Sequence, residues 1–184
     1  MHWLLQSLRR AATKAGARAH PVDGGCVVAP SPGALPAYVA RGHWALAAPE
    51  LDSRLELLIA QLAAELSGCR WCIEQGWHRW RKAYLPAEVL RALQDYRVNP
   101  LYSDRDRAAL ALAEAVVRYS EREPTAAEAI LATARGVFTE VEVARMIQIA
   151  AREHFFNPVN GAIGLDAVES LELPRELERP PVGL

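Results

Sequence analysis

Hydrophobic and polar positions recur with helical spacing in several stretches of the chain. After Ser53, apolar side chains return three, four and seven positions apart, which is the spacing of one helical face. Comparable faces follow Ser103 and Thr139. The three faces comprise Leu55, Leu58, Ile59, Leu62 and Leu66; Ala109, Leu112, Ala113 and Val116; and Val143, Ile147 and Ala150, with His154 continuing the last. The pattern predicts an all-α fold, a compact bundle of six to eight helices.

Helix boundaries are marked by capping sequences and prolines. The capping-box form, in which a hydroxyl residue precedes an acidic one by three positions, occurs four times. Prolines also fall where helices are expected to begin or end. The capping pairs are Ser53 with Glu56, Ser103 with Asp106, Thr125 with Glu128 and Thr139 with Glu142, and the prolines are Pro86, Pro100, Pro124 and Pro158.

Composition supports the helical interpretation and excludes two classes of function. The 184 residues suffice for one domain, and 33 Ala and 23 Leu far outnumber the β-branched residues. Lys+Arg 21 against Asp+Glu 22 gives a net charge of -1, without the positive excess of nucleic-acid-binding proteins. No apolar run approaches the ~20 residues of a membrane span, so an integral membrane protein is not expected.

Residues 1–33 differ from the remainder and are interpreted as a basic arm and linker preceding a helical domain at 34–184. Four basic side chains precede the first acid, Asp23, beside a short apolar stripe that includes Trp3. Such a segment is either a targeting or membrane-surface helix, or a helix packed on the protein's own oligomer. The second interpretation is favoured.

Cysteine usage points to redox or metal chemistry. Three cysteines in a chain of this length do not form a secreted disulfide scaffold, and without an evident secretory signal we expect a cytoplasmic protein. Cys69 and Cys72 form a CxxC, whereas Cys26 stands alone. In a reducing compartment a CxxC is either redox-active or metal-binding.

The CxxC follows a helix stop, Ser67-Gly68, and is expected to open a new helix. Cys69 is placed in its first turn and Cys72 one turn later, where free N–H groups and the helix dipole favour a thiolate. On a helix, cysteines three apart have Cβ atoms ~5–6 Å apart, whereas a disulfide needs ~3.5–4.5 Å. Bridging is therefore expected to distort the helix and to give an easily reduced bond.

Two other interpretations of the CxxC remain open. Zinc would take Cys69, Cys72 and His78, with Cys26 or His154 as the fourth ligand, but the second closely spaced ligand pair usual in structural zinc sites is absent. Alternatively, the cysteines are small buried apolar residues. We expect no metal.

Three segments resemble the alkylhydroperoxidase D-like, or carboxymuconolactone decarboxylase-like, families. The strongest is LDSRLELLIAQLAAELSGCRWC, in which a helix leads through Ser-Gly into C-x-x-C. The other two are YSDRDRAALALAEAVVRYS and FTEVEVARMIQIAAREHFFNPVNGAIGLD, and the resemblance covers roughly residues 47–166.

This resemblance implies an all-α alkylhydroperoxidase D-like bundle, a homo-oligomer and an antioxidant, thiol-based reduction of peroxides. In that scheme Cys72 attacks the peroxide and Cys69 resolves the resulting sulfenic acid as a disulfide. A disulfide is the other substrate that Cys72 is expected to attack. An electron-donating dithiol protein would return the electrons, and no cofactor is needed. The decarboxylase branch fits poorly, because it does not depend on a CxxC.

The sequence departs from the family at its proton relay. Peroxidase members carry Glu twelve residues before the first cysteine and His four after the second, and here those positions hold Leu57 and Gly76. Glu65 first and His78 second are the candidate substitutes, although both side chains also fit surface or interface roles. An alternative function is a non-catalytic oligomeric binding module that has kept the fold and lost the relay.

Aromatic and polar residues near the motif have two interpretations each. Trp71, Trp77, Trp80 and Tyr84 form either a pocket mouth or, as we favour, core and subunit-interface packing. His154 is either a buried, hydrogen-bonded histidine, the favoured interpretation, or a donor to the CxxC. Asn157 and Asn160 are expected to cap a helix break at Pro158.

Overall fold

A computed structural model of the chain describes residues 51–119 and 123–162, and every regular element in these two ranges is a helix. The elements are α3 (Ser53–Leu66), α4 (Arg70–Lys82), α5 (Ala87–Arg91), the 3-10 helix η1 (Leu93–Asp95), α6 (Asp104–Val117), α7 (Pro124–Arg135) and α8 (Glu140–Ala162). The all-α fold expected from the sequence is confirmed. Residues 1–33, with Cys26, lie outside the described ranges.

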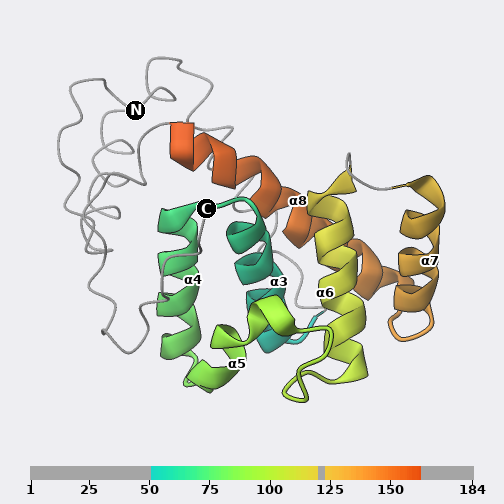
Figure 1. Cartoon of the computed structure of the whole chain (residues 1–184), viewed down its shortest axis with the longest axis horizontal. Coiled ribbons are helices and arrows are strands. Elements are labelled where there is room, and N and C mark those ends of the chain that lie inside the picture. Colours follow the sequence, from blue (N-terminus) through green and yellow to red (C-terminus); the bar gives the residue numbers. More distant parts are fainter. Residues whose placement is uncertain (1–50, 120–122, 163–184) are drawn as a thin grey trace.

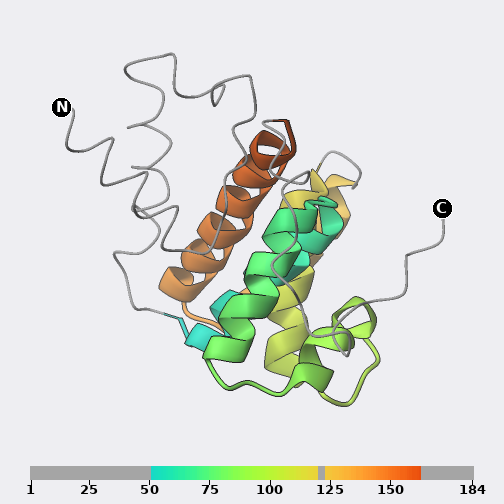
Figure 2. The same cartoon turned by 90° about the vertical axis from the view of Figure 1, so that its left-hand side faces the viewer.

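Helix α3 forms the centre of the bundle and packs against α4, α6 and α8 (Figures 1 and 2). Its apolar face supplies Leu58, Ile59 and Leu62, which are completely or almost completely buried. Burial of such aliphatic side chains stabilises a fold by roughly 1.5–3 kcal/mol each. The contact of α3 with both α4 and α8 brings the CxxC region next to the end of α8.

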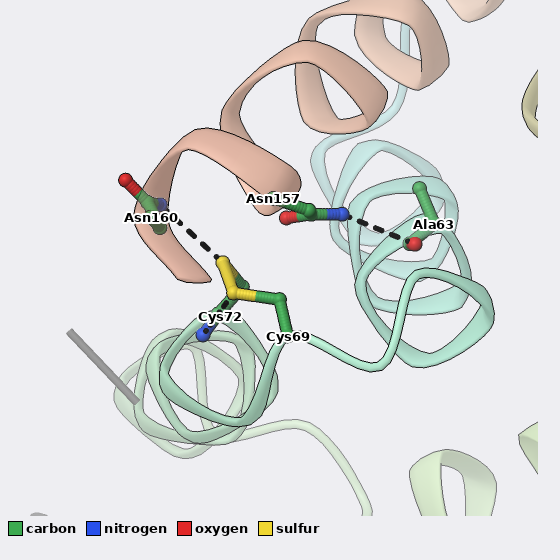
Figure 3. The surroundings of a disulfide bond; sticks show 5 residues. All are labelled: Ala63, Cys69, Cys72, Asn157 and Asn160. Atoms are coloured by element: carbon green, nitrogen blue, oxygen red, sulfur yellow. Dashed lines mark hydrogen bonds between the residues drawn. A yellow bond between two sulfur atoms is a disulfide. The ribbon is translucent and has the colours of Figure 1, made fainter. Parts of the chain in front are cut away.

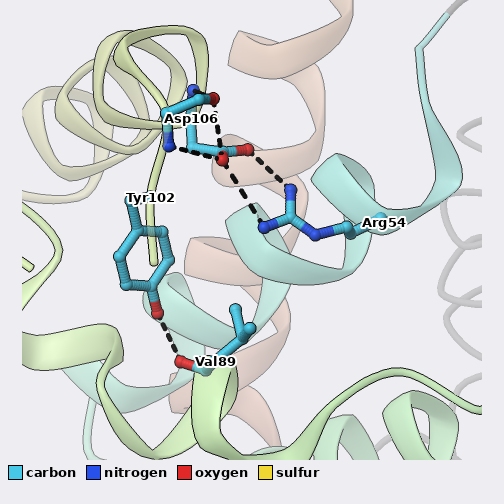
Figure 4. Close-up of polar contacts among 5 residues, drawn as sticks. Arg54, Val89, Tyr102 and Asp106 are labelled. Atoms are coloured by element: carbon cyan, nitrogen blue, oxygen red, sulfur yellow. Dashed lines mark hydrogen bonds and ion pairs between the residues drawn. The ribbon is translucent and has the colours of Figure 1, made fainter. Parts of the chain in front are cut away.

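The start of α6 is fixed by the capping box predicted from the sequence. The Ser103 hydroxyl accepts from the Asp106 N–H at 3.1 Å, and the Asp106 carboxylate accepts from the Ser103 N–H at 3.0 Å. The same carboxylate binds Arg54 of α3 at 2.7 Å, which joins the two helices (Figure 4). Immediately before it, the Tyr102 hydroxyl donates to the Val89 carbonyl (Figure 4).

The other predicted capping boxes have mixed outcomes. Thr139 and Glu142 make the reciprocal bonds of a capping box. In α3, however, Asp52 is the N-cap residue and its side chain makes no capping bond. Helix α7 begins at Pro124, whose fixed φ suits the first helical position, so Thr125 already lies inside the helix.

The helix break expected at Pro158 is wrong, because α8 continues through this residue to Ala162. Proline removes the hydrogen bond that its N–H would donate to the carbonyl four residues earlier. Both Pro158 and the residue four earlier, His154, are exposed, so water can hydrate the released carbonyl. Asn157 and Asn160 consequently lie within the helix rather than capping its end.

Within the two described ranges, none of the helices combines the length and the apolar character needed to cross a bilayer.

Candidate functional site

The connection from α3 to α4 is three residues long and depends on Gly68. This glycine has φ +67°, a left-handed conformation that side chains with a Cβ rarely adopt. The Gly68 N–H donates to the Glu65 carbonyl at 3.2 Å, and the Cys69 N–H donates to the Ala64 carbonyl at the same distance. The turn thereby satisfies the end of α3 and places Cys69 immediately before the first residue of the next helix, Arg70.

Cys69 and Cys72 are joined by a disulfide at the start of α4 (Figure 3). Cys69 is the N-cap residue, with extended backbone angles, and its Sγ accepts the Cys72 N–H at 3.3 Å. Their Cα atoms are 5.3 Å apart, within the usual range for disulfides. The expected distortion of the helix is therefore wrong, because Cys69 precedes the helical residues instead of belonging to the first turn.

The two sulfur-bearing residues differ in access and in polar contacts. Cys69 is 2% exposed and Cys72 is 8% exposed. The Asn160 side-chain amide of α8 donates to Cys72 Sγ at 3.4 Å, as Figure 3 shows. One turn earlier, the Asn157 amide donates to the Ala63 carbonyl at 3.1 Å and ties α8 to α3. Cys72 is thus the sulfur that faces α8.

A cavity of about 320 Å³ opens between α4 and α8 and is lined by Cys72. Cys69 is not part of its lining. Four lining residues lie on one face of α4, namely Cys72, Gln75, Gly76 and Arg79, and four lie on α8, namely Arg152, Glu153, Phe156 and Asn160. Trp71 and Ala60 complete the wall. Of the two disulfide-bonded residues, Cys72 therefore lines the cavity and Cys69 lies behind it.

Solved structures with the same helical arrangement include two different proteins. The chain superposes on ATU0492 of Agrobacterium tumefaciens, described as a protein of unknown function and a candidate antioxidant defence protein AhpD. The TM-score is 0.66 and the identity 22%, over 72% of this chain and 89% of that one. The present chain has an alkylhydroperoxidase D-like fold.

The debrominase Bmp8 shares this fold, with a TM-score of 0.63 and 18% identity over 79% of this chain and 75% of Bmp8. A cysteine-to-alanine variant of Bmp8 in complex with 2,3,4-tribromopyrrole matches similarly, with a TM-score of 0.66 over 80% and 75% of the two chains. No family model matches the sequence, and no curated protein matches it. The alkylhydroperoxidase D-like assignment thus describes the fold.

The two positions at which peroxidase members of this fold carry their relay are occupied differently here. Leu57 is half-buried and packs against the core. Gly76 lines the cavity, and a Cβ at this position would lie 1.8 Å from Oε1 of Gln61. Gln61 itself is 1% exposed, so its side chain fills the space that a larger residue at position 76 would need.

The first candidate substitute, Glu65, lies at the end of α3 and away from the cavity lining. Its carboxylate accepts from the Gln61 amide at 3.0 Å and from the Gln94 amide. Neighbouring Glu56, one residue before the family's position, pairs with buried Arg145 at 2.9 Å. The structure therefore gives both carboxylates structural partners, and a catalytic role for Glu65 stays a prediction.

The second candidate, His78, is half-buried on α4 and is also absent from the cavity lining. Burial lowers the pKa of the His78 imidazole, and the positive charges of Lys82 and Arg81 lower this pKa further. The assignment of His78 as an acid or base likewise stays a prediction.

The aromatic residues of α4 separate into different roles. Trp77 and Trp80 are 3% and 1% exposed and belong to the core, where the Trp80 indole donates to the Pro86 carbonyl at 2.9 Å. Trp71 lines the cavity, and Tyr84 is 96% exposed. Each of the two interpretations of this cluster thus holds for part of it.

His154 is exposed, so the expectation of a buried histidine is wrong. In the last turns of α8 the buried side passes through Asn157, seven residues after Ala150, and through Asn160. Among the described residues, no group of three or more His, Cys, Asp or Glu side chains is arranged to hold a metal ion. The zinc alternative that includes Cys26 lies outside the described ranges.

Several cavity residues were not identified from the sequence as site residues: Gln75, Arg79, Arg152, Glu153 and Phe156. The spacing on each helix was a usable signal, since positions 72, 75, 76 and 79 share one face, as do 153, 156 and 160. That these two faces meet depends on how α8 crosses α4. Neither helix's own sequence contains that information.

Proposed function

We propose that the chain is a CxxC thiol oxidoreductase that reduces peroxides, with Cys72 as the attacking thiol and Cys69 as the resolving thiol. The observation that carries the proposal is the position of Cys72, which is bonded to Cys69 and also lines the cavity between α4 and α8. An attacking thiol needs contact with substrate, whereas a resolving thiol needs contact only with its partner. Cys72 meets the first requirement and Cys69 the second.

The polar surroundings of Cys72 suit a thiolate. The Asn160 amide donates toward Cys72 Sγ, and a donor in this position favours the charged form of the sulfur. Cys72 also lies in the first turn of α4, where the helix dipole is positive. The thiolate is the nucleophile in peroxide reduction, so both features support attack by this residue.

Cys69 is suited to leave when the disulfide is reduced. Its Sγ occupies the N-cap site and accepts the Cys72 N–H, an interaction that stabilises negative charge. A donor thiolate reaching the cavity would attack Cys72 Sγ, and Cys69 would depart as the stabilised thiolate. The same buried thiolate then stands next to Cys72 for the following cycle.

The cycle balances with a dithiol as the only other reactant. Cys72 thiolate attacks the terminal peroxide oxygen, the O–O bond breaks, and the leaving alkoxide takes a proton to give the alcohol. Cys69 then attacks the Cys72 sulfenic acid, and the S–S bond forms with loss of water. The donor dithiol exchanges with this disulfide, becomes oxidised itself and returns both cysteines to the reduced state.

The test is peroxide consumption by the full chain, with dithiothreitol as the dithiol. We expect Cys72→Ser to abolish consumption. Cys69→Ser should leave a sulfenic acid on Cys72 that dimedone labels after one equivalent of peroxide in the absence of dithiothreitol. Cys26→Ser, outside the motif, serves as the control and should retain activity.

Peroxide consumption that persists in Cys72→Ser, or dimedone labelling of Cys69 instead, would contradict the proposal. Folding of each variant is checked by circular dichroism and thermal unfolding. If Cys72→Ser and Cys69→Ser both keep full activity, the result favours the non-catalytic binding module instead.

A further inference from the structure

The cavity beside Cys72 is bounded by two helical faces that both lead away from the sulfur. Cys72 lies at the start of α4 and Asn160 at the end of α8, and the two are in contact. Seven residues onward along α4 comes Arg79, and seven residues back along α8 comes Glu153. At 1.5 Å per residue, each step spans about 10 Å. The cavity therefore has a sulfur end and a far end on the same two helices.

Charge is concentrated at the far end. Arg152 and Glu153 pair with each other, the two guanidinium nitrogens lying 3.1 and 2.6 Å from one carboxylate oxygen. The Arg79 guanidinium, in contrast, has no hydrogen-bond or ion-pair partner within the part of the chain that the structure describes. Two positive charges against one negative leave this end with a net positive charge, carried by Arg79.

Between the two ends the lining is largely apolar. Phe156 of α8 lies between Asn160 and Glu153, and Trp71 and Ala60 contribute further apolar surface. Gly76 and Gln75 lie opposite, halfway along the α4 face. Gly76 contributes only backbone to this middle section. A ligand that fills the cavity therefore meets sulfur, then apolar surface, then a guanidinium.

We infer that the site binds amphipathic organic acids, with the carboxylate on Arg79, the apolar body along Phe156 and Trp71, and the reactive group about 10 Å away at Cys72. A guanidinium binds a carboxylate through parallel N–H groups, and the apolar body gains from burial. The inference rests on the proposed function for the identity of the reactive group, a hydroperoxide. The binding preference itself does not depend on turnover.

The binding test uses the oxidised protein, which does not consume peroxide. The probes are 4-phenylbutyrate and its neutral amide, which differ in charge and little in size, and affinity is measured by calorimetry. We expect the carboxylate to bind about five-fold more tightly than the amide, as for one partly exposed ion pair. Arg79→Gln should remove the difference.

Arg81→Gln is the matched control. Arg81 lies two residues further along α4, is exposed, contacts His78 and does not line the cavity. This variant removes the same charge from the same helix and should keep the preference for the carboxylate. Equal loss in both variants would show a general charge effect and would overturn the inference.

Turnover provides the second measurement. Arg79→Gln should raise KM about five-fold for a hydroperoxide bearing a carboxylate, whereas Arg81→Gln should leave this KM unchanged. Turnover without this preference would overturn the inference and leave the proposed function standing. A carboxylate preference in binding without any turnover would support the inference and count against the proposed function.

Discussion

At the scale of single residues, position 76 shows how one side chain changes the chemistry that this fold can support. Gly76 leaves space that buried Gln61 enters, with Oε1 lying 1.8 Å from the place of a Cβ. Gln61 Oε1 has no hydrogen-bond partner among the described residues. A histidine at this position would displace Gln61 and break its bond to Glu65.

This packing predicts energetic coupling between positions 61 and 76. Alanine is favoured over glycine in a helix by about 1 kcal/mol, but in the native background Gly76→Ala must also displace Gln61. We therefore expect Gly76→Ala to be more favourable by at least about 1 kcal/mol in a Gln61→Ala background than alone. Urea unfolding of the four proteins measures this difference. Equal effects in the two backgrounds would refute the packing argument.

The titratable groups near the site give a second prediction at this scale. Glu153 lines the cavity with Cys72, whereas Glu65 and His78 do not. Glu153 lies about 10 Å along the cavity from Cys72, beyond the reach of direct proton transfer, so we expect Glu153→Gln to slow the oxidation of Cys72 by hydrogen peroxide by less than about three-fold. Glu65→Gln and His78→Asn should each cost less than about three-fold.

The readout is the rate of thiol loss in single-turnover mixing, with its pH profile to separate proton transfer from a purely structural effect. A larger loss in Glu65→Gln or His78→Asn would reinstate the assignment made from the sequence.

At the scale of helices, the N-terminus of α6 depends on one carboxylate that binds two partner residues. Asp106 accepts from Ser103 and from Arg54 of α3, as described above. Burial is the largest single influence and raises the pKa of the Asp106 carboxyl, but the hydrogen bonds from Arg54 and Ser103 together hold this pKa below its ordinary value. The capping box and the α3–α6 contact therefore share one titrating group.

A carboxyl group whose pKa is lower in the folded state stabilises the protein at pH values above its unfolded-state pKa. This stabilisation is lost as the pH falls through the folded-state pKa. Asp106→Asn should therefore reduce the free energy of unfolding at pH 7 and reduce it less below about pH 4. Chemical denaturation of both proteins at pH 7 and pH 3 measures the two differences. A cost of equal size at both pH values would show that the charge of Asp106 contributes nothing.

Sequence patterns predicted the starts of helices correctly where the expected capping residues make capping hydrogen bonds. Ser103 and Thr139 open helices as expected, and Ser67-Gly68 ends α3 as expected. The Pro158 signal failed because an exposed proline near a helix end costs one hydrogen bond that water replaces. Such an outcome depends on tertiary exposure, which a sequence pattern does not record.

At the scale of the whole molecule, the alkylhydroperoxidase D-like fold was predictable and the cavity was not. The CxxC, its glycine stop and the periodic faces are local, so the sequence identified Cys69 and Cys72 as a candidate redox pair, and the structure joins them in a disulfide. The partner wall depends on α8 packing over α3 and α4, with Asn160 meeting a cysteine 88 positions away. This crossing is a property of the assembled bundle.

The expectation of a homo-oligomer also belongs to this scale. Large apolar side chains are exposed on the described part of the chain, including Tyr84 at 96%, Val98 at 83% and Tyr119 at 73%. We expect light scattering coupled to size-exclusion chromatography to give a mass at least twice the 20.2 kDa of one chain. A single species of one-chain mass would contradict this expectation.

The most direct test of the central claim is the oxidation of the fully reduced protein by one equivalent of hydrogen peroxide at pH 7. Thiol loss is followed by stopped-flow mixing, and the products are mapped by mass spectrometry of proteolytic fragments. We predict oxidation faster than that of free cysteine and a fragment in which Cys69 and Cys72 are linked. Oxidation at the rate of free cysteine, or without this linkage, would contradict the account.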